Sequence, residues 1–213
     1  MGGVNIVSVA GACSRSGKTA LAENLLRSLR GGAAAVKFTT TDDVFERCPR
    51  GTPCVVCDIN VPYRIVDDPR VLGEAGTDTA RFGAAGARLV LWAIAKQNAV
   101  SAAWGAVRAL ISTEDVVVME GSTIVDLSSP TLCFFVVHPF LSPERWKPTS
   151  SALLERADAV IINIPEGEPR PPSPLVLAEI ARVRGRSGVR VADLTRPLAD
   201  WAPDLMERLA LAS

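Results

Sequence analysis

NIVSVAGACSRSGKTALAENLLRSL, residues 5–29, is the stretch of sequence that decides the fold. It begins with a short apolar run and ends in a segment whose apolar side chains recur at helical spacing. Between the two, ACSRSGKT at residues 12–19 follows the spacing GxxxxGK[ST], with alanine at the first glycine position. Small residues between a strand and a helix let successive backbone N–H groups turn toward an anion. The segment therefore predicts a phosphate-binding loop (P-loop).

Each residue of this loop has an expected task. Lys18 is expected to reach the β- and γ-phosphates of a nucleotide, and the Thr19 hydroxyl to ligate Mg²⁺. Cys13 lies where backbone dipoles could lower a thiol pKa, but we favour the plainer interpretation that it fills a small loop position. The expected nucleotide-binding set in the loop is Ser14, Arg15, Ser16, Gly17, Lys18, Thr19 and Ala20.

The rest of the chain alternates short apolar runs with helix-like segments, the pattern of a mostly parallel sheet covered on both faces. We expect one domain over residues 1–213, a three-layer α/β fold of P-loop NTPase type with about seven strands flanked by helices. The expected strands are 5–9, 34–38, 88–94, 115–119, 132–137, 159–162 and 190–192, and the expected helices are 18–29, 78–86, 99–111, 149–156, 175–184 and 197–211.

Charge and composition argue against several classes of partner. Lys plus Arg equals Asp plus Glu at 23 each, and no run of like charges suits nucleic acid or lipid. No apolar stretch reaches the roughly eighteen residues that span a bilayer, and no secretory signal precedes the loop. We expect a cytoplasmic protein that binds neither nucleic acid nor membrane, whose five cysteines are thiols or metal ligands.

An acidic residue at the end of a buried strand is the second part expected of such a site, close to Mg²⁺ and the attacking water. DVVVMEG, residues 115–121, has that form. Its apolar residues deliver Glu120 to the end of the strand, and Gly121 lets the backbone approach the γ-phosphate.

Two more carboxylates follow the apolar run AAVKF. Asp42 and Asp43 would lie beside the P-loop if the two strands are neighbours, and either could bind the metal through water. Lys37, within the run, is either a second phosphate contact or a solvent-facing lysine. Together with Lys18 and Glu120, the two aspartates complete the expected catalytic set.

Residues 39–74 do not fit the alternating pattern and are interpreted as an insertion rich in Pro and Cys. Cys48, Cys54 and Cys57 have the spacing C-x5-C-x2-C, in which two close cysteines can aim both sulfurs at one metal. We favour an iron–sulfur cluster, such as [4Fe-4S], over Zn²⁺. Cys133, Asp58 or a partner subunit could supply a fourth ligand, and unligated thiols remain the alternative.

Four stretches together, GACSRSGKTALAENLLRSL, VKFTTTDD, GTDTARFGAAGARLVLWAIA and VVVMEG, resemble the molybdopterin-guanine dinucleotide biosynthesis adaptor (MobB-like) family of P-loop GTPases. The resemblance covers residues 1 to about 125. Its most telling part is the run Asp78, Thr79, Arg81, Ala85, Gly86 and Ala87.

This resemblance implies a nucleotide on Gly17, Lys18 and Thr19, with Glu120 on the metal or water side, and a link to metallocofactor maturation. It also implies that Asp78 and Arg81 face the nucleotide or a dimer partner. The sequence departs from the family at residues 39–58, TTTDDVFERCPRGTPCVVCD, which replace a short histidine-bearing link.

Asn163 is the candidate residue for recognising the nucleotide base. It ends an apolar run and could read a base edge. No Lys or Asp follows in the register of the guanine-reading sequence N-K-x-D, so the pattern favours ATP over GTP.

The expected function is therefore Mg-dependent hydrolysis of a nucleoside triphosphate, by a homodimer that drives a partner or a metallocofactor step. Two alternatives stay open. One is a small-molecule kinase in which Arg47, Arg50, Arg64 and Arg70 clamp an acceptor. The other is a binding module whose nucleotide regulates a partner without turnover.

Overall fold

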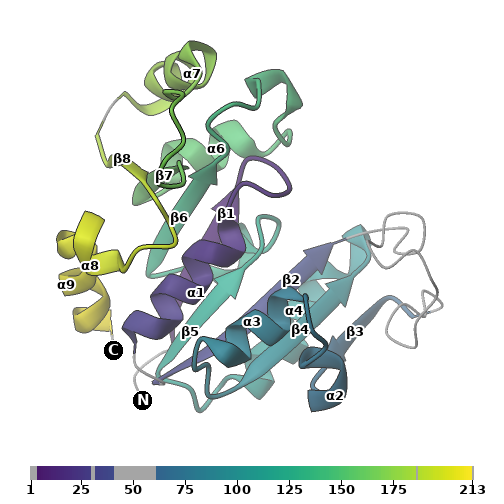
Figure 1. Ribbon diagram of the computed structural model, residues 1–213. Helices are drawn as coiled ribbons and strands as arrows, with labels where there is room; N and C mark the ends of the chain where they lie inside the picture. Colours follow the sequence, from purple (N-terminus) through teal and green to yellow (C-terminus); the bar gives the residue numbers. More distant parts are fainter. Residues whose placement is uncertain (1–3, 30–31, 41–60, 186, 213) are drawn as a thin grey trace.

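The computed structural model describes residues 4–29, 32–40, 61–185 and 187–212. One eight-stranded sheet runs through the domain in the order β3-β4-β2-β5-β1-β6-β7-β8 (Figure 1). The strands are β1 (Asn5–Gly11), β2 (Ala33–Thr40), β3 (Tyr63–Val66), β4 (Val90–Ala95), β5 (Val116–Glu120), β6 (Leu132–Val137), β7 (Ala159–Asn163) and β8 (Val189–Ala192). Every neighbouring pair is parallel except β3 with β4.

Helices cover both faces of the sheet, so the predicted three-layer α/β fold is confirmed. Strand side chains point alternately to opposite faces, so Val7 and Val9 pack in the cluster with α1, whereas Ile6 packs in the cluster with α4. The helices are α1 (Lys18–Ser28), α2 (Pro69–Leu72), α3 (Asp78–Ala84), α4 (Val100–Leu110), α5 (Val125–Ser128), α6 (Ser150–Arg156), α7 (Pro174–Arg184), α8 (Leu198–Trp201) and α9 (Pro203–Ala212), with 3₁₀ turns η2 (Gln97–Ala99) and η3 (Pro143–Arg145).

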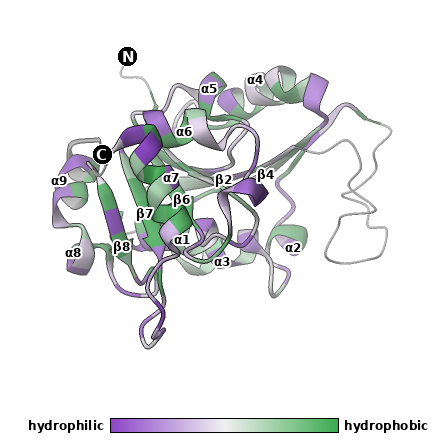
Figure 2. Ribbon diagram, turned by 90° about the horizontal axis from the view of Figure 1, so that it is seen from above, coloured by the Kyte–Doolittle hydropathy of each residue, from purple (hydrophilic) through white to green (hydrophobic). Residues whose placement is uncertain are grey.

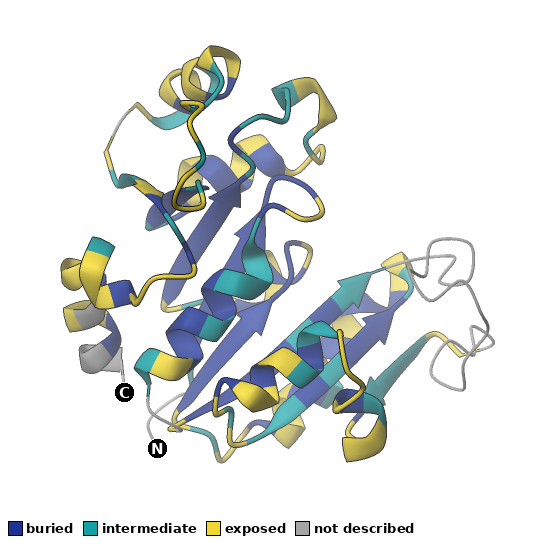
Figure 3. Cartoon of the chain, in the orientation of Figure 1, coloured by how far each residue is buried: buried dark blue, intermediate teal, exposed yellow. Residues whose placement is uncertain are grey.

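The central strands are almost wholly buried, which explains their continuous apolar runs. All six residues of β6 and all five of β5 are buried, Glu120 among them (Figure 3). Coloured by hydropathy, the strands in the middle of the sheet are mostly apolar, and polar residues gather in the helices and loops around them (Figure 2). A carboxylate at the end of such a strand therefore requires specific partners.

The structure adds one strand to those expected. Tyr63–Val66 forms β3 inside the segment interpreted as an insertion, and it pairs antiparallel with β4 at the edge of the sheet. The short helix α2 follows, with Asp68 as N-cap and Pro69 in its first turn. Residues 41–60, with the remainder of the expected insertion, lie outside the described residues.

The C-terminal helix was expected as a single element over 197–211, and this prediction is wrong. The chain turns at Ala202, with φ −149° and ψ 62°, and α9 begins at Pro203. Proline disfavours the helical conformation in the residue before it and has no N–H to donate, so one continuous helix is broken here.

Within the residues that the structure describes, no helix is both long and apolar enough to cross a membrane.

Candidate functional site

The P-loop connects the end of β1 to the start of α1, as the sequence predicts. Gly17 immediately precedes α1 with φ 105° and ψ 9°, a backbone conformation that L side chains rarely adopt. A Cβ at Gly17 would lie 2.7 Å from Nδ2 of Asn163, and one at Gly11 would lie 2.6 Å from Oγ of Ser16. A side chain at Gly11 would thus displace the side chain of Ser16, and at Gly17 the backbone conformation also favours glycine.

Two polar groups of the loop point to an anion. The ammonium of Lys18 donates to the carbonyl of Cys13 at 2.8 Å, across the loop rather than to a carboxylate. The buried Oγ of Ser16 has no hydrogen-bond partner among the described residues. Because a buried polar atom without a partner is costly, the loop suits a ligand that supplies the missing bonds.

Burial lowers the pKa of Lys18 to about 8, although the carboxylate of Glu120 acts in the opposite direction. The same physical cause raises the pKa of the Cys13 thiol, against the lowering effect of Lys18. Cys13 is 7% exposed and therefore fills a small buried position, in agreement with the plainer interpretation of this cysteine.

A cluster of two carboxylates, one hydroxyl and one ammonium lies at the start of α1. Thr19 Oγ1 is 3.0 Å from Asp78 Oδ1 and 3.0 Å from Glu120 Oε2. Lys37 Nζ bridges the other two carboxylate oxygens, at 2.6 Å from Asp78 and 2.5 Å from Glu120. Asp78, Glu120 and Thr19 thus converge from α3, β5 and α1.

The fold explains why these four residues meet. Lys37 stands opposite Glu120 in the parallel pairing of β2 with β5. Asp78 is the first residue of α3, which is capped by the Thr77 side chain accepting from the Ala80 N–H. Each charged group therefore lies on a regular element, and the cluster is built before any ligand arrives.

The charges of this cluster neutralise one another. Burial alone would lower the pKa of Lys37, but Glu120 and Asp78 outweigh it and the pKa is raised. Burial alone would raise the pKa of Asp78, but Lys37 outweighs it and the pKa is lowered. The side chain of Lys37 is only 20% exposed, so the alternative of a solvent-facing lysine is wrong.

The other residues expected near the nucleotide lie on the loop, on α1 and on α3. Ser14 and Arg15 are exposed on the loop, and Arg15 has a positive φ of 58°. Ala20 lies in the first turn of α1. Arg81 forms an ion pair with Glu23 of α1 at 2.8 Å, so its guanidinium is engaged within the chain.

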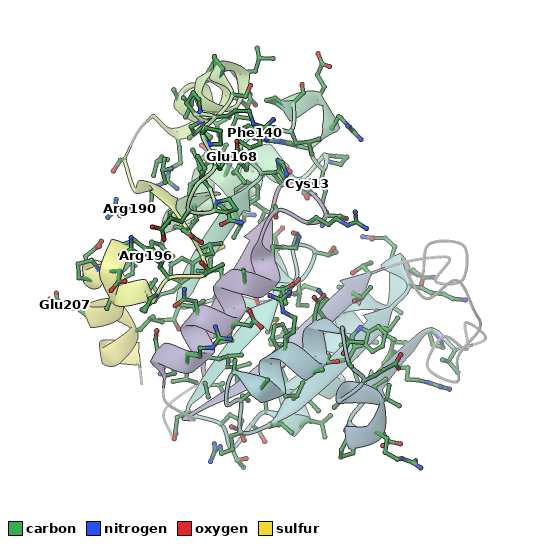
Figure 4. All side chains as sticks on the ribbon, in the orientation of Figure 1. Cys13, Phe140, Glu168, Arg190, Arg196 and Glu207 are labelled. Carbon is green, nitrogen blue, oxygen red and sulfur yellow. The ribbon has the colours of Figure 1, made fainter. Side chains whose placement is uncertain are left out.

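Asn163 closes the opposite side of the loop, at the end of β7. Its Oδ1 accepts from the Leu194 N–H at 3.3 Å, and Nδ2 is the atom that approaches Gly17. Nearby, Phe140 carries the guanidinium of Arg170 over its ring at 4.2 Å, so the loops after β6 and β7 are in contact. Figure 4 labels Phe140 and Glu168 in these two loops and Cys13 in the P-loop.

The metal interpretation of the cysteines falls partly outside the described residues. Cys48, Cys54 and Cys57 lie there, as do Asp42, Asp43 and Asp58. Among the residues that are described, no group of three or more His, Cys, Asp or Glu side chains could hold a metal ion. Cys133 is buried in the apolar core on β6, and burial raises its pKa to about 12, which disfavours the thiolate that a metal requires.

Some residues of this site gave no signal in the sequence. Ser122 Oγ lies between the backbone N–H and C=O of Gly11, at 3.2 and 3.3 Å, and so ties β5 to the start of the loop. Lys147 donates its backbone N–H to the carbonyl of Ala12 at 2.8 Å. Both contacts join residues more than a hundred positions apart, so only the order of the strands reveals them.

Comparison with known proteins identifies the fold. No family model matches the chain, and no curated protein matches it. HypB from Helicobacter pylori, in a crystal structure in complex with nickel, is similar in three dimensions, with a TM-score of 0.52 and 12% identity, over 98% of this chain and 86% of HypB. The MinC:MinD cell division protein complex of Aquifex aeolicus gives a TM-score of 0.47 and 16% identity, over 96% of this chain and 86% of the other.

The chain has the P-loop NTPase fold. At 12% identity the likeness to HypB shows this fold alone, and the resemblance to the MobB-like family stays a prediction. What this P-loop NTPase fold does is therefore argued from its own site.

Proposed function

We propose that this protein binds a Mg-nucleoside triphosphate and hydrolyses it. The observation that carries the proposal is the Thr19 hydroxyl shared between Asp78 and Glu120, one residue after Lys18. That places an acidic, hydroxyl-bearing site directly beside a loop built for phosphates. Such a pair of neighbouring sites is what a magnesium–triphosphate complex requires.

The triphosphate tail is held by the loop itself. Backbone N–H groups from Ser14 to Ala20 and the ammonium of Lys18 bind the phosphate oxygens, and the Ser16 hydroxyl gains the partner it lacks. Lys18 then exchanges its bond with the Cys13 carbonyl for one with a phosphate. A phosphate also favours the charged form of Lys18, against the burial that lowers its pKa.

Mg²⁺ fits the oxygen atoms of Thr19, Asp78 and Glu120, because hydroxyl and carboxylate oxygens are the ligands that this hard cation prefers. When bound, Mg²⁺ would neutralise charge on the phosphate oxygens. Lys37 holds both carboxylates in place.

Glu120 is the residue proposed to orient the attacking water. It is 1% exposed and ends β5 beside Gly121, where a Cβ would lie 2.9 Å from the Phe38 carbonyl, so backbone and carboxylate are packed closely together. Little covalent chemistry is required of the protein, since positioning and charge supply most of the catalysis. Asp42 and Asp43 stay candidates for a contact with the metal through water.

ATP is the favoured nucleotide. The Oδ1 atom of Asn163 accepts from the Leu194 N–H, which leaves the Nδ2 group of Asn163 as a donor toward a base edge. Asp193, at the neighbouring strand end, accepts from the N–H groups of Glu166 and Thr195 and from the Thr195 hydroxyl. A carboxylate engaged in this way is poorly placed to accept from guanine, which presents donors on its reading edge.

The biological step driven by hydrolysis is proposed from the sequence. The MobB-like resemblance and the spacing of Cys48, Cys54 and Cys57 support a cytoplasmic homodimer that acts in metallocofactor maturation with a metalloenzyme or cofactor-biosynthesis partner. The cysteines are proposed to hold an iron–sulfur cluster, with Zn²⁺ as the alternative.

The test is nucleotide-dependent phosphate release by protein purified without oxygen, measured with Mg-ATP and Mg-GTP together with metal content. Lys18→Ala should reduce release by about a hundredfold or more, because it removes the ammonium that is directed across the loop. Arg88→Ala, which removes an exposed ion pair with Glu114, is the matched control and should leave release unchanged.

Three results would count against hydrolysis. Transfer of phosphate to an added metabolite would favour the kinase alternative, and tight binding without release would favour the regulatory module. Normal binding of Mg-nucleotide by Lys18→Ala would refute the assignment of the loop.

A further inference from the structure

The segment between β6 and α6 brings Lys147 to the P-loop, and no sequence motif predicts this. The backbone N–H of Lys147 donates to the Ala12 carbonyl at 2.8 Å, and the Ser150 hydroxyl reaches the same carbonyl at 3.3 Å. Two hydrogen bonds thus fasten this segment to the first residue of the ACSRSGKT loop. In Figure 1 the segment rises beside the tip of β1.

Internal contacts also order this segment. The Trp146 indole donates to the Leu141 carbonyl at 3.2 Å, and its ring packs against the apolar cluster of β6 and α6. The Ser150 N–H donates to the Lys147 carbonyl at 2.9 Å. The backbone of Lys147 is therefore fixed from both sides, and its side chain starts from a defined position.

The ammonium of Lys147 lies within electrostatic reach of Cys13, Lys37 and Glu120, and it also acts on Lys18. Cys13 belongs to the loop itself, and Lys37 and Glu120 belong to the cluster proposed to hold Mg²⁺, so the charge of Lys147 acts on both. Although Lys147 is an exposed residue, desolvation by the surrounding protein lowers its pKa.

A count of charges shows what the loop requires. Three ammonium groups, from Lys18, Lys37 and Lys147, share this region. Its two carboxylates, Glu120 and Asp78, already form ion pairs with Lys37. Within the described parts of the chain, Lys147 has no carboxylate at ion-pair distance, and Lys18 bonds only a carbonyl. Three ammonium groups against two carboxylates leave one positive charge in excess, and the two ammonium groups without a carboxylate partner, those of Lys18 and Lys147, suit an anion from outside the chain.

We propose that Lys147 binds the terminal phosphate of the nucleoside triphosphate, opposite Lys18. This inference rests on the proposed function and adds to it a residue that distinguishes a triphosphate from a diphosphate. A cation whose backbone is fastened to the loop is well placed to stabilise charge where it is greatest, on the γ-phosphate. Once that phosphate is gone, Lys147 has no anion to bind.

The experiment compares the affinities of Mg-ADP and of a non-hydrolysable Mg-ATP analogue for the full chain by calorimetry. Lys147→Ala should weaken the triphosphate analogue by about tenfold or more and ADP by less than about twofold, because one charge-assisted hydrogen bond is lost. Lys147→Arg should restore most of the preference. The backbone N–H bond to Ala12 survives in both variants, so the loop keeps its anchor.

Lys96→Ala is the matched control. Lys96 follows β4 at the same edge of the sheet, and it is not among the charges that act on Lys18, Lys37 or Lys147. Both affinities should stay unchanged in this variant.

Two outcomes would overturn the inference. Equal weakening of both nucleotides by Lys147→Ala would show that the side chain only supports the loop. Unchanged affinities would show that Lys147 does not bind the nucleotide. If the wild-type chain bound neither nucleotide, the proposed function itself would fail, and this result is distinct from the other two.

Discussion

Replacing Lys37 by methionine tests whether the acidic cluster is a cation site. The substitution keeps most of the apolar stem but leaves Glu120, whose side chain is 2% exposed, facing Asp78 without the ammonium between them. Breaking a buried ion pair by removing one partner costs about 3–5 kcal/mol. Asp78 is 38% exposed and partly screened by water, so we expect the lower end, about 3 kcal/mol. For a chain of this size that is a fall of about 6–12 °C in Tm.

Magnesium should reverse much of this loss. In Lys37→Met the negative charges of Asp78 and Glu120 are no longer balanced within the cluster, so millimolar MgCl₂ should raise the stability of the variant more than that of the wild type. Denaturant unfolding with and without MgCl₂ measures both effects.

Arg88→Met is the matched control, since it breaks an ion pair whose arginine is 53% exposed and should cost less than about 1 kcal/mol. If Lys37→Met were as stable as this control and indifferent to Mg²⁺, the cluster would not be a cation site.

Two further results are expected. Asn24 is 4% exposed on α1 and bonds the carbonyls of Leu194 and Arg196 and the N–H of Leu198. Asn24→Ala should therefore cost about 2–4 kcal/mol in chemical unfolding, and a loss below about 1 kcal/mol would contradict this role. The pKa of Lys18 is lowered to about 8, so the folded protein releases this proton before the unfolded chain does, and the Lys18 contribution to stability rises with pH above about 8. Mg-nucleotide affinity should fall over the same range as the ammonium is lost, whereas Lys18→Arg should hold its affinity constant, and identical pH profiles would refute the assignment.

The sequence predicts the central part of the fold well, because its strands are apolar runs and its P-loop has a fixed spacing. Asn5–Gly11, the loop and Lys18–Ser28 appear where they are expected. The edge strand β3 does not, since it has only four residues between Pro62 and Asp67, of which only Val66 is buried, and so gives no periodic signal.

The acidic cluster shows where reasoning from sequence stops. Glu120 is predicted because it ends an apolar run beside a glycine. That Lys37 holds it depends on β2 and β5 being neighbours in the order β4-β2-β5-β1, and strand order is not written in local patterns. The position of Lys147 is even harder to predict from the sequence, because its contact with Ala12 depends on β6 lying next to β1.

The pairing of Lys37 opposite Glu120 also bears on how the sheet assembles. The other paired residues of β2 and β5 are Ala, Val and Met, which would pack acceptably in more than one alignment. If β2 shifted by two residues, the ammonium of Lys37 would lie against an apolar neighbour and the buried carboxylate of Glu120 would lose its partner. The misaligned sheet would therefore contain two unpaired charges, which is unfavourable. Lys37 and Glu120, which belong to the proposed ligand site, thus also favour the correct alignment of β2 with β5 during folding.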